Sequence, residues 1–158
     1  MSRHLRAGVL LKALAACIAF VGSSAAIAAL GGDAGSVAAD RVAFAAQLRS
    51  TAMLQYDVHA ISSDARTVRE YVSRQGQVFA VTWHGPVPPD LRQLLGDYFP
   101  RFQSAAVAAH QHSPGQHRIF TLAQSDLVIQ SMGRLRSFRG IAYLPALVPA
   151  GVAIDQLQ

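Results

Sequence analysis

Cysteine and glutamate each occur only once in this sequence of 158 residues, and each scarcity excludes a class of site. The single cysteine, Cys17, excludes an internal disulfide framework and any zinc site built from several thiolates. Glu70 is the only glutamate and the aspartates are scattered, so the carboxylate pair of a glycoside hydrolase has little support. Internal repeats, low-complexity tracts, a helical HExxH motif and a nucleophile elbow are also missing.

The chain does contain enough apolar sequence for one folded domain. Hydrophobic residues make up 51% of it, which excludes intrinsic disorder as the expected state. The length fits a single domain, and folding would bury roughly two thirds of the surface that the unfolded chain exposes.

The first 28 residues have the features of an export signal. Arg3 and Arg6 give a basic start, an apolar run follows over residues 13–21, and Ala26-Ile27-Ala28 supplies a small-x-small site. We therefore predict a signal peptide over residues 1–28, cleaved after Ala28. A transmembrane anchor is the less favoured interpretation, because the apolar stretch is interrupted by glycine and serine and is shorter than a span needs.

Removal of this segment would leave 130 residues, in which eleven arginines face nine acidic residues. So small a positive charge gives little support for nucleic-acid binding, and a cysteine-free chain suits an oxidising compartment. We expect a periplasmic or secreted protein with no transmembrane span after processing. As an alternative, residues 14–17 have the form of a bacterial lipobox, in which Cys17 would be acylated to give a lipoprotein.

The spacing of apolar residues predicts the secondary structure of the mature chain. A glycine-rich segment at residues 30–36 is expected to be a flexible leader, and a short helix is expected at residues 36–48. From residue 52 onward apolar and polar residues alternate, which predicts half-buried antiparallel strands. The predicted strands cover residues 52–60, 68–73, 78–84, 119–123, 127–132 and 135–144. Phe79, Val81 and Trp83 are expected on one face of their strand.

The main helix is predicted between the third and fourth strands. Asp90 and Gln93 form an N-terminal capping pattern, and Pro100 predicts a kink or restart. The segment is expected to continue to residue 109 with one apolar face. That face consists of Leu91, Leu94, Leu95, Tyr98 and Phe102, and Phe79, Trp83, Tyr98 and Phe102 are expected in the core.

These elements predict an α+β fold. Consecutive hairpins imply a single small domain with an antiparallel sheet of about five to six strands and one main helix packed on it. We divide the chain into the signal peptide over residues 1–28, an N-terminal leader and short helix over residues 29–50, and the α+β domain over residues 51–158.

Several short motifs of the mature chain point together to one known family. They are Leu30-Gly31-Gly32, Val68-Arg69-Glu70-Tyr71-Val72-Ser73, Gly76 with Val78-Phe79-Ala80-Val81-Thr82-Trp83, Gly85-Pro86, Pro89-Asp90-Leu91, Leu94-Leu95-Gly96 and the tail Ala142-Tyr143-Leu144-Pro145 with Pro149, Gly151 and Val152. With them the chain resembles the proteobacterial domain of unknown function 2844 family over nearly its whole mature length. The resemblance implies an exported protein and carries over no catalytic residue, since the family has no assigned activity. The turn at residues 131–136 differs from the glycine- and histidine-containing turn of that family.

Histidines gather in the polar segment at residues 110–117, which we expect to be a loop. His110 and His112 would point the same way in an extended segment, and His117 would fold back toward them. Neutral imidazoles suit zinc or copper, so these three residues are candidate metal ligands. The competing interpretation is a polar exposed loop with adventitious binding or none, and no other cofactor is expected.

A hydrolytic site has weaker support. Asp57, His59, Ser62 and Ser63 lie near one another in sequence, but a nucleophile needs a base and an orienting group brought to it. A solvated outward strand face explains Asp57 and His59. Nothing in the sequence therefore assembles a specific catalytic set.

Arginines cluster at the last predicted hairpin. Arg134, Arg136 and Arg139 lie close together, with Arg118 expected on a neighbouring strand. A guanidinium matches carboxylates and phosphates, so these residues are candidate ligands for an anionic glycan or a lipid head group. The alternative is a charged edge that discourages aggregation between strands.

From these observations we expect an exported binding or interaction module of the periplasm or cell envelope, without enzymatic activity. Its partner would be another envelope protein or an envelope polymer. A metal-binding protein or metalloenzyme that uses the histidine loop is the first alternative, and anionic glycan or lipid binding by the arginine hairpin is the second.

Overall fold

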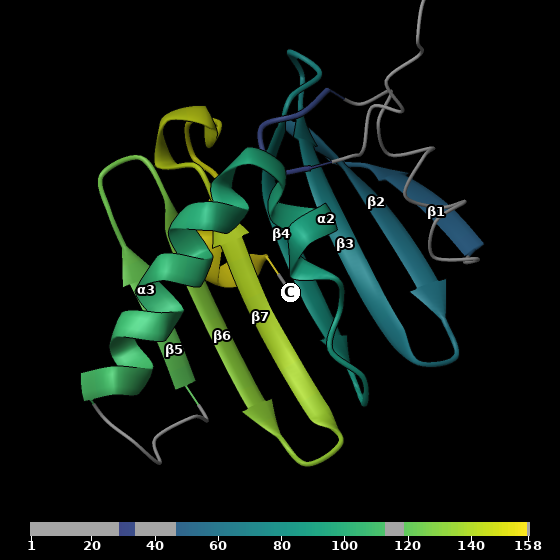
Figure 1. Ribbon diagram of the computed structural model, residues 1–158. Helices are drawn as coiled ribbons and strands as arrows, with labels where there is room; N and C mark the ends of the chain where they lie inside the picture. The colour runs from purple at the N-terminus through teal and green to yellow at the C-terminus, as the bar shows by residue number, and fades with distance from the viewer. Residues whose placement is uncertain (1–28, 34–46, 113–118, 158) are drawn as a thin grey trace, which may run out of the picture.

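The computed structural model describes residues 29–33, 47–112 and 119–157, and these form one antiparallel sheet with helices on one side (Figure 1). The strand order is β1-β2-β3-β4-β7-β6-β5. The α+β prediction is confirmed, with seven strands in place of about five to six. The strands are β1 (Gln47–Ala52), β2 (Tyr56–Ser63), β3 (Arg66–Ser73), β4 (Val78–Gly85), β5 (Ile119–Ala123), β6 (Val128–Arg134) and β7 (Ser137–Tyr143).

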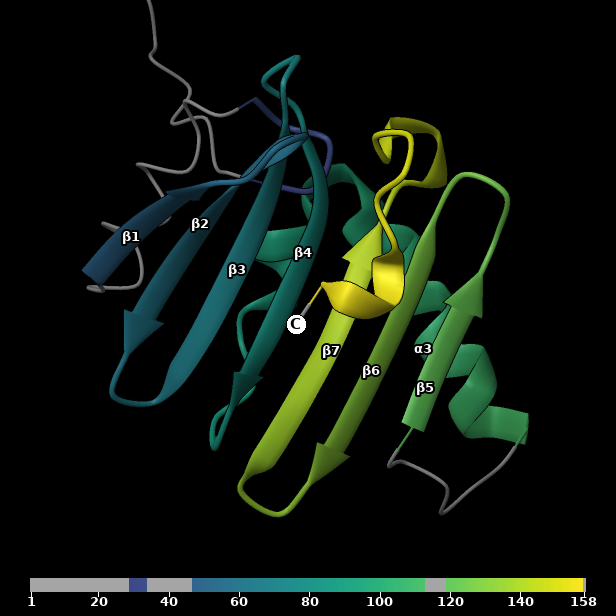
Figure 2. The ribbon, with the colours of Figure 1, turned by 180° about the vertical axis from the view of Figure 1, so that it is seen from behind.

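One long connection separates the two halves of the sheet. After β4 the chain forms α2 (Leu91–Leu95) and α3 (Phe99–His112), which carry it across the sheet toward the edge where β5 lies (Figure 1). Strands β6 and β7 then return, and β7 pairs with β4 at the centre. The helices thus cover one face of the sheet, which we call the helix face, and leave the rear face to the C-terminal segment (Figure 2).

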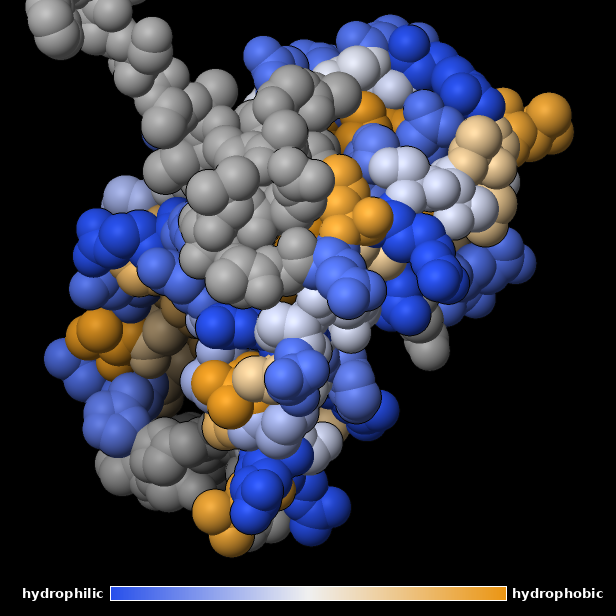
Figure 3. Space-filling view, turned by 90° about the vertical axis from the view of Figure 1, so that its right-hand side faces the viewer, coloured by the Kyte–Doolittle hydropathy of each residue, from blue (hydrophilic) through white to orange (hydrophobic). Residues whose placement is uncertain are grey.

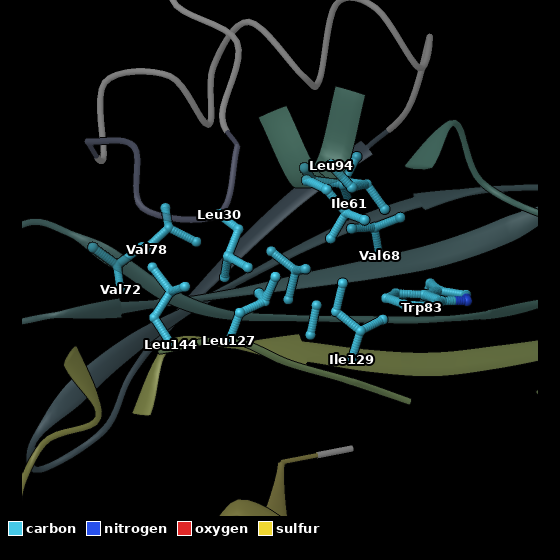
Figure 4. Packing of buried hydrophobic residues seen from close by; sticks show 13 residues of the cluster. Leu30, Ile61, Val68, Val72, Val78, Trp83, Leu94, Leu127, Ile129 and Leu144 are labelled. Carbon is cyan, nitrogen blue, oxygen red and sulfur yellow. The ribbon is translucent and has the colours of Figure 1, made fainter. Parts of the chain in front are cut away.

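The larger core cluster lies on the helix face. Leu94 and Leu95 of α2 are fully buried with Ile61, Val81 and other strand residues. Figure 4 shows the side chains of Ile61, Val68 and Leu94 gathered at one end of the cluster, with Trp83 beside Ile129. The predicted apolar face of the helix is confirmed, because Leu91, Tyr98 and Phe102 also pack against this cluster.

The N-terminal residues 30–33 belong to the folded domain, so the expectation of a flexible leader is wrong for them. Leu30 is 3% exposed and enters the core near Val78 (Figure 4). Its backbone N–H donates to the carbonyl of Leu94 at 3.0 Å, and Gly31 N–H donates to the carbonyl of Val78 at 2.8 Å. This short segment therefore forms hydrogen bonds to both α2 and the start of β4.

The predicted short helix at residues 36–48 is wrong at its C-terminal end. Gln47 and Leu48 begin β1, which pairs with β2 as an edge strand. Residues 36–46 lie outside the part of the chain that the structure describes. The predicted strand at 52–60 actually begins at Tyr56, because Ala52 ends β1 and a turn intervenes.

The helix restarts as Pro100 predicted. Asp90 Oδ1 accepts hydrogen bonds from the backbone N–H groups of Arg92 (2.9 Å) and Gln93 (3.2 Å), so Asp90 is the N-cap of α2. Gly96, at a φ of 50°, ends α2, and a 3-10 turn follows before α3 begins. Helix α3 continues to His112, three residues beyond the predicted end.

A bulge in the β3–β4 pair corrects one predicted face. Tyr71 is paired with Ala80 but Val72 with Val78, so Phe79 is the extra residue. Val81 and Trp83 face the helices, whereas Phe79 belongs to the rear cluster with Tyr71. The prediction that Phe79 shares a face with Val81 and Trp83 is wrong, because a bulge shifts the alternation of side chains by one residue.

The C-terminal segment covers part of the rear face (Figure 2). It contains two 3-10 turns, Pro145–Leu147 and Ile154–Gln156. Leu157 is buried against Tyr71, Phe79 and Ala80, with Tyr56 stacked edge-on against Phe79 at 5.7 Å. The chain end is thus fixed beside the centre of the sheet.

Gly140 in β7 is required for the central strand pairing. A Cβ there would lie 2.2 Å from the ring of Trp83 and 2.5 Å from the carbonyl oxygen of Gln130. Gly140→Ala is expected to lower the free energy of unfolding by about 1–3 kcal/mol, because neither the Trp83 ring nor the Gln130 carbonyl can move away without disturbing the sheet. Urea unfolding measures this. Gly133→Ala in the same hairpin is the control, since its Cβ would meet only the ring of Phe138 at 3.2 Å. Equal decreases in the free energy of unfolding for the two variants would contradict the prediction.

Arg101 of α3 anchors the helix to the turn between β5 and β6. It forms two hydrogen bonds to the Asp126 carboxylate, at 2.7 and 2.8 Å, and these lower the pKa of Asp126. A lowered pKa means that the stabilisation is present at neutral pH and is lost as the pH falls through the folded-state value.

Asp126→Asn is therefore expected to melt below the wild type at neutral pH, with the difference vanishing in acid. Thermal melts from neutral pH to below about pH 3 test this, and added salt is expected to shrink the difference because the pair is exposed. A difference that stays constant over the whole pH range would show that the ion pair is not its cause.

Candidate functional site

Two rows of side chains cross the rear face where β3, β4, β7, β6 and β5 lie side by side. The strand register sets the first row as Arg69, Thr82, Ile141, Gln130 and Thr121. The second row is Thr67, His84, Arg139, Met132 and Ile119. Neighbours in a row belong to adjacent strands about 4.8 Å apart, so each row forms a continuous line of side chains.

These rows form the floor of a groove of about 820 Å³. The C-terminal segment, seen crossing in front of β7 in Figure 2, supplies one wall. Thr82 is buried in the floor, while Gln130, Thr121 and Arg139 are exposed. The wall residues are Ile154, Asp155 and Leu157.

The groove contains two arginines, Arg69 and Arg139. The ion pairs Arg74–Asp57 and Arg101–Asp126 include neither of them. Arg139 Nη2 instead lies 3.4 Å from the sulfur of Met132, its neighbour across the β6–β7 pair. His84 is paired with Arg139 in register, on the adjacent strand. This side of the groove is therefore suited to an anion.

Tyr71, whose hydroxyl is bonded to Thr82, stays uncharged at neutral pH. Burial raises the pKa of Tyr71, although its hydrogen bond with Thr82 (3.4 Å between hydroxyl oxygens) acts in the opposite direction. Tyr71 is thus a neutral phenol that fixes the hydroxyl of Thr82. No negative charge from this tyrosine offsets the arginines.

The three arginines predicted as ligands have different positions. Arg139 lies in the groove, whereas Arg134 is the last residue of β6, paired with Ser137 beside the hairpin turn. Arg136 is in that turn, at a φ of 59°. Arg118, expected on a neighbouring strand, lies outside the described residues.

The predicted histidine loop is corrected in part. His110 and His112 belong to the last turn of α3, not to a loop. Residues two apart on a helix are about 160° apart around its axis, so the two positions do not share a face. His117 lies outside the described residues. Within the described ranges, no three histidine, cysteine or acidic residues are grouped so as to hold a metal ion.

The residues considered for hydrolysis are bonded to other groups. Asp57 pairs with Arg74 at 3.2 Å, and Ser62 shares a hydrogen bond with Thr67 at 3.3 Å. His59 Nδ1 lies 2.8 Å from Ser50 Oγ of β1.

Asp57 and His59 lie on one face of β2, as predicted. It is the helix face, because His59 is in register with the fully buried Glu70, and both residues stay partly exposed there. Ser63 donates to the carbonyl of Arg66 at 3.4 Å. The structure therefore brings neither Ser62 nor Ser63 to His59.

Most of the groove residues could not be recognised as a site from the sequence, because they come from five different strands. Arg69, Thr82, His84 and Gln130 each looked like an ordinary polar position of one strand. A signal was present in the alternation of β4, where Thr82 and His84 fall opposite Val81 and Trp83. That signal becomes a site only when the strand order is known.

A second, smaller hollow of about 420 Å³ lies along α3, where Phe99, Phe102 and Val107 contribute to its lining. On the side at the β1 edge, hydrophobic side chains lie in small separate patches among hydrophilic ones (Figure 3). In the part of the chain that the structure covers, no helix combines the length and apolar character needed to cross a membrane.

The left-handed conformation of Arg136 identifies it as a strained turn residue. Arg136→Gly is expected to raise the free energy of unfolding by up to about 1 kcal/mol, because glycine adopts this φ without steric cost. Leu135→Gly, at the other turn position, is the control. It is expected not to raise the free energy of unfolding, since the φ of Leu135 is not positive. Chemical denaturation compares the two, and a loss of stability in Arg136→Gly would contradict the prediction.

Comparison with known proteins gives one match. The family model described as "Protein of unknown function (DUF2844)" matches residues 26–157, which is most of the chain. No curated protein and no solved structure matches. Most of the motifs that suggested this family from the sequence lie in strands β3, β4 and β7 and around α2, and Leu30-Gly31-Gly32 is hydrogen-bonded to Leu94 and Val78. The chain therefore belongs to the DUF2844 family of proteins of unknown function.

Proposed function

We propose that this protein is an exported binding module that holds a polymer of the cell envelope in the groove on its rear face. The observation that carries the proposal is the groove itself, with two arginines and a histidine beside hydroxyl and amide side chains. Arg69 and Arg139 stand outside the ion pairs Arg74–Asp57 and Arg101–Asp126, so an anionic group of a ligand can pair with them.

Export is proposed from the signal-like sequence of residues 1–28, which lie outside the described residues. Cleavage after Ala28 would leave Leu30 free to enter the core next to the new chain end. The family match begins at residue 26, close to this site, which supports a boundary there. Acylation at Cys17 remains the alternative form of processing. The mass of the mature protein distinguishes the two.

Binding is favoured over catalysis by the chemistry of the groove. It is lined by Thr82, Gln130 and Thr121, which donate and accept hydrogen bonds but are not activated nucleophiles. His84 is in register with Thr67 on one side and Arg139 on the other, and the hydroxyl of Thr67 shares a hydrogen bond with Ser62. The acid that would orient a histidine base is Asp155, which is on the wall and not on the floor. The arrangement can recognise and orient a ligand.

A site-specific photocrosslinker tests this proposal. Gln130 is exposed in the centre of the first row, so a benzophenone amino acid in its place would contact anything in the groove. With the isolated envelope fraction of the native host, we expect this variant to capture envelope polymer, detected by sugar analysis and mass spectrometry of the adduct.

Ser104 of α3 gives the matched control. It is equally exposed but lies on the helix side of the sheet, so a crosslinker there is expected to capture about tenfold less. Equal capture at the two positions, or capture of nothing at Gln130, would refute the groove as the binding site.

A further inference from the structure

The charge of the groove is spread along its length. Arg69 and Arg139 lie two strands and two residues apart on the same face, which places their Cα atoms about 12 Å from each other. The two long side chains can reach one anion together, and the rows that continue across β6 and β5 leave room for a longer ligand. A polymer with more than one negative group can therefore contact both arginines and the rest of the groove.

Exposed amide and hydroxyl side chains lie beyond the arginines, toward β5. Gln130 and Thr121 continue the row that begins with Arg69, whereas Thr82 is buried with its hydroxyl bonded to Tyr71. Hydroxyl and amide groups both donate and accept, as sugar hydroxyls do, so they can exchange paired hydrogen bonds with a carbohydrate. A ligand with charge alone would leave these groups unused.

The backbone beneath the groove is not available for recognition. Strands β3, β4, β7 and β6 are interior to the sheet, so their N–H and C=O groups are used in the ladders, and the open edge of β5 lies at the end of the groove away from Arg69. A peptide bound by strand addition needs an open edge instead. Recognition here therefore depends on side chains, which favours a sugar polymer over a peptide strand.

We infer that the groove binds an acidic polysaccharide, with Arg69 and Arg139 contacting carboxylates and Gln130 and Thr121 contacting hydroxyls. This inference rests on the proposed function and names its ligand class. Asp155 on the groove wall opposes an anion, so it limits the affinity and sets the end of the groove that the charged groups avoid.

Polygalacturonate is the probe, with its methyl ester as the uncharged form of the same polymer. By biolayer interferometry the mature protein is expected to bind polygalacturonate and to bind the ester at least about tenfold more weakly. Arg69→Gln and Arg139→Gln are each expected to weaken binding about tenfold, since each removes a charge-assisted hydrogen bond. Asp155→Asn is expected to tighten it.

Arg92→Gln is the matched control. It makes the same change in net charge on the helix side, where Arg92 lies 4.7 Å above the ring of Phe99. This variant is expected to bind like the wild type. Melting curves of all four variants identify any that fail to fold, and the ester comparison keeps the test valid because it needs only the wild type.

Four outcomes would overturn the inference. Equal binding of the ester, or no binding of polygalacturonate, would show that carboxylates are not recognised. Equally strong binding of inorganic polyphosphate would show that charge alone acts. Binding of phosphatidylglycerol vesicles in place of the polysaccharide would assign the arginines to lipid. In each case capture at Gln130 decides separately whether the proposed function stands.

Discussion

The contact between Trp83 and Gly140 is the constraint on which the rest of the structure depends. Trp83 of β4 and Gly140 of β7 are paired where the two halves of the sheet meet, and the indole occupies the space that a Cβ of residue 140 would need. Because the strands can approach here, the β2–β3–β4 meander and the β5–β6–β7 meander form one sheet. The same pairing aligns the groove on the other face, since Thr82 and His84 flank Trp83 while Arg139 and Ile141 flank Gly140.

The two faces of the sheet differ in how they are packed: the helix face holds the main core, and the rear face stays partly exposed. Burial of Leu94, Leu95 and Leu30 against the helix face supplies most of the apolar contact that stabilises the domain. The rear face is only partly covered, because the C-terminal segment packs over the tyrosine and phenylalanine side chains near Tyr71 and stops there. The remaining rows of polar and basic side chains stay accessible. A small domain can expose such a surface because its other face already provides a continuous core.

The elements with strong local signals were predictable. The alternation of apolar and polar residues located most of the strands, Asp90 marked the start of α2, and Pro100 marked the restart of the helix. Elements that depend on partners distant in the sequence were not predictable. Residues 30–33 looked like a glycine-rich leader, yet β4 and α2 provide hydrogen-bond partners that order them. His110 and His112 looked like loop residues, but alanines before them extend α3 by one further turn. The predicted face of Phe79 was wrong, because the alternation of apolar and polar residues does not reveal a bulge.

The sequence by itself determined the class of the fold, its main helix, its family and the presence of arginines near the last hairpin, because each depends on residues that are neighbours in the chain. Only the tertiary structure decided which residues form the site. The order β3-β4-β7-β6-β5 places Arg69 in line with Thr121, although 51 residues lie between them in the sequence. Strand order is fixed by the crossover of α2 and α3 and by the packing of Trp83 on Gly140, which are long-range interactions. For that reason Arg139 became a groove residue, while Arg136 became a turn residue of the same hairpin.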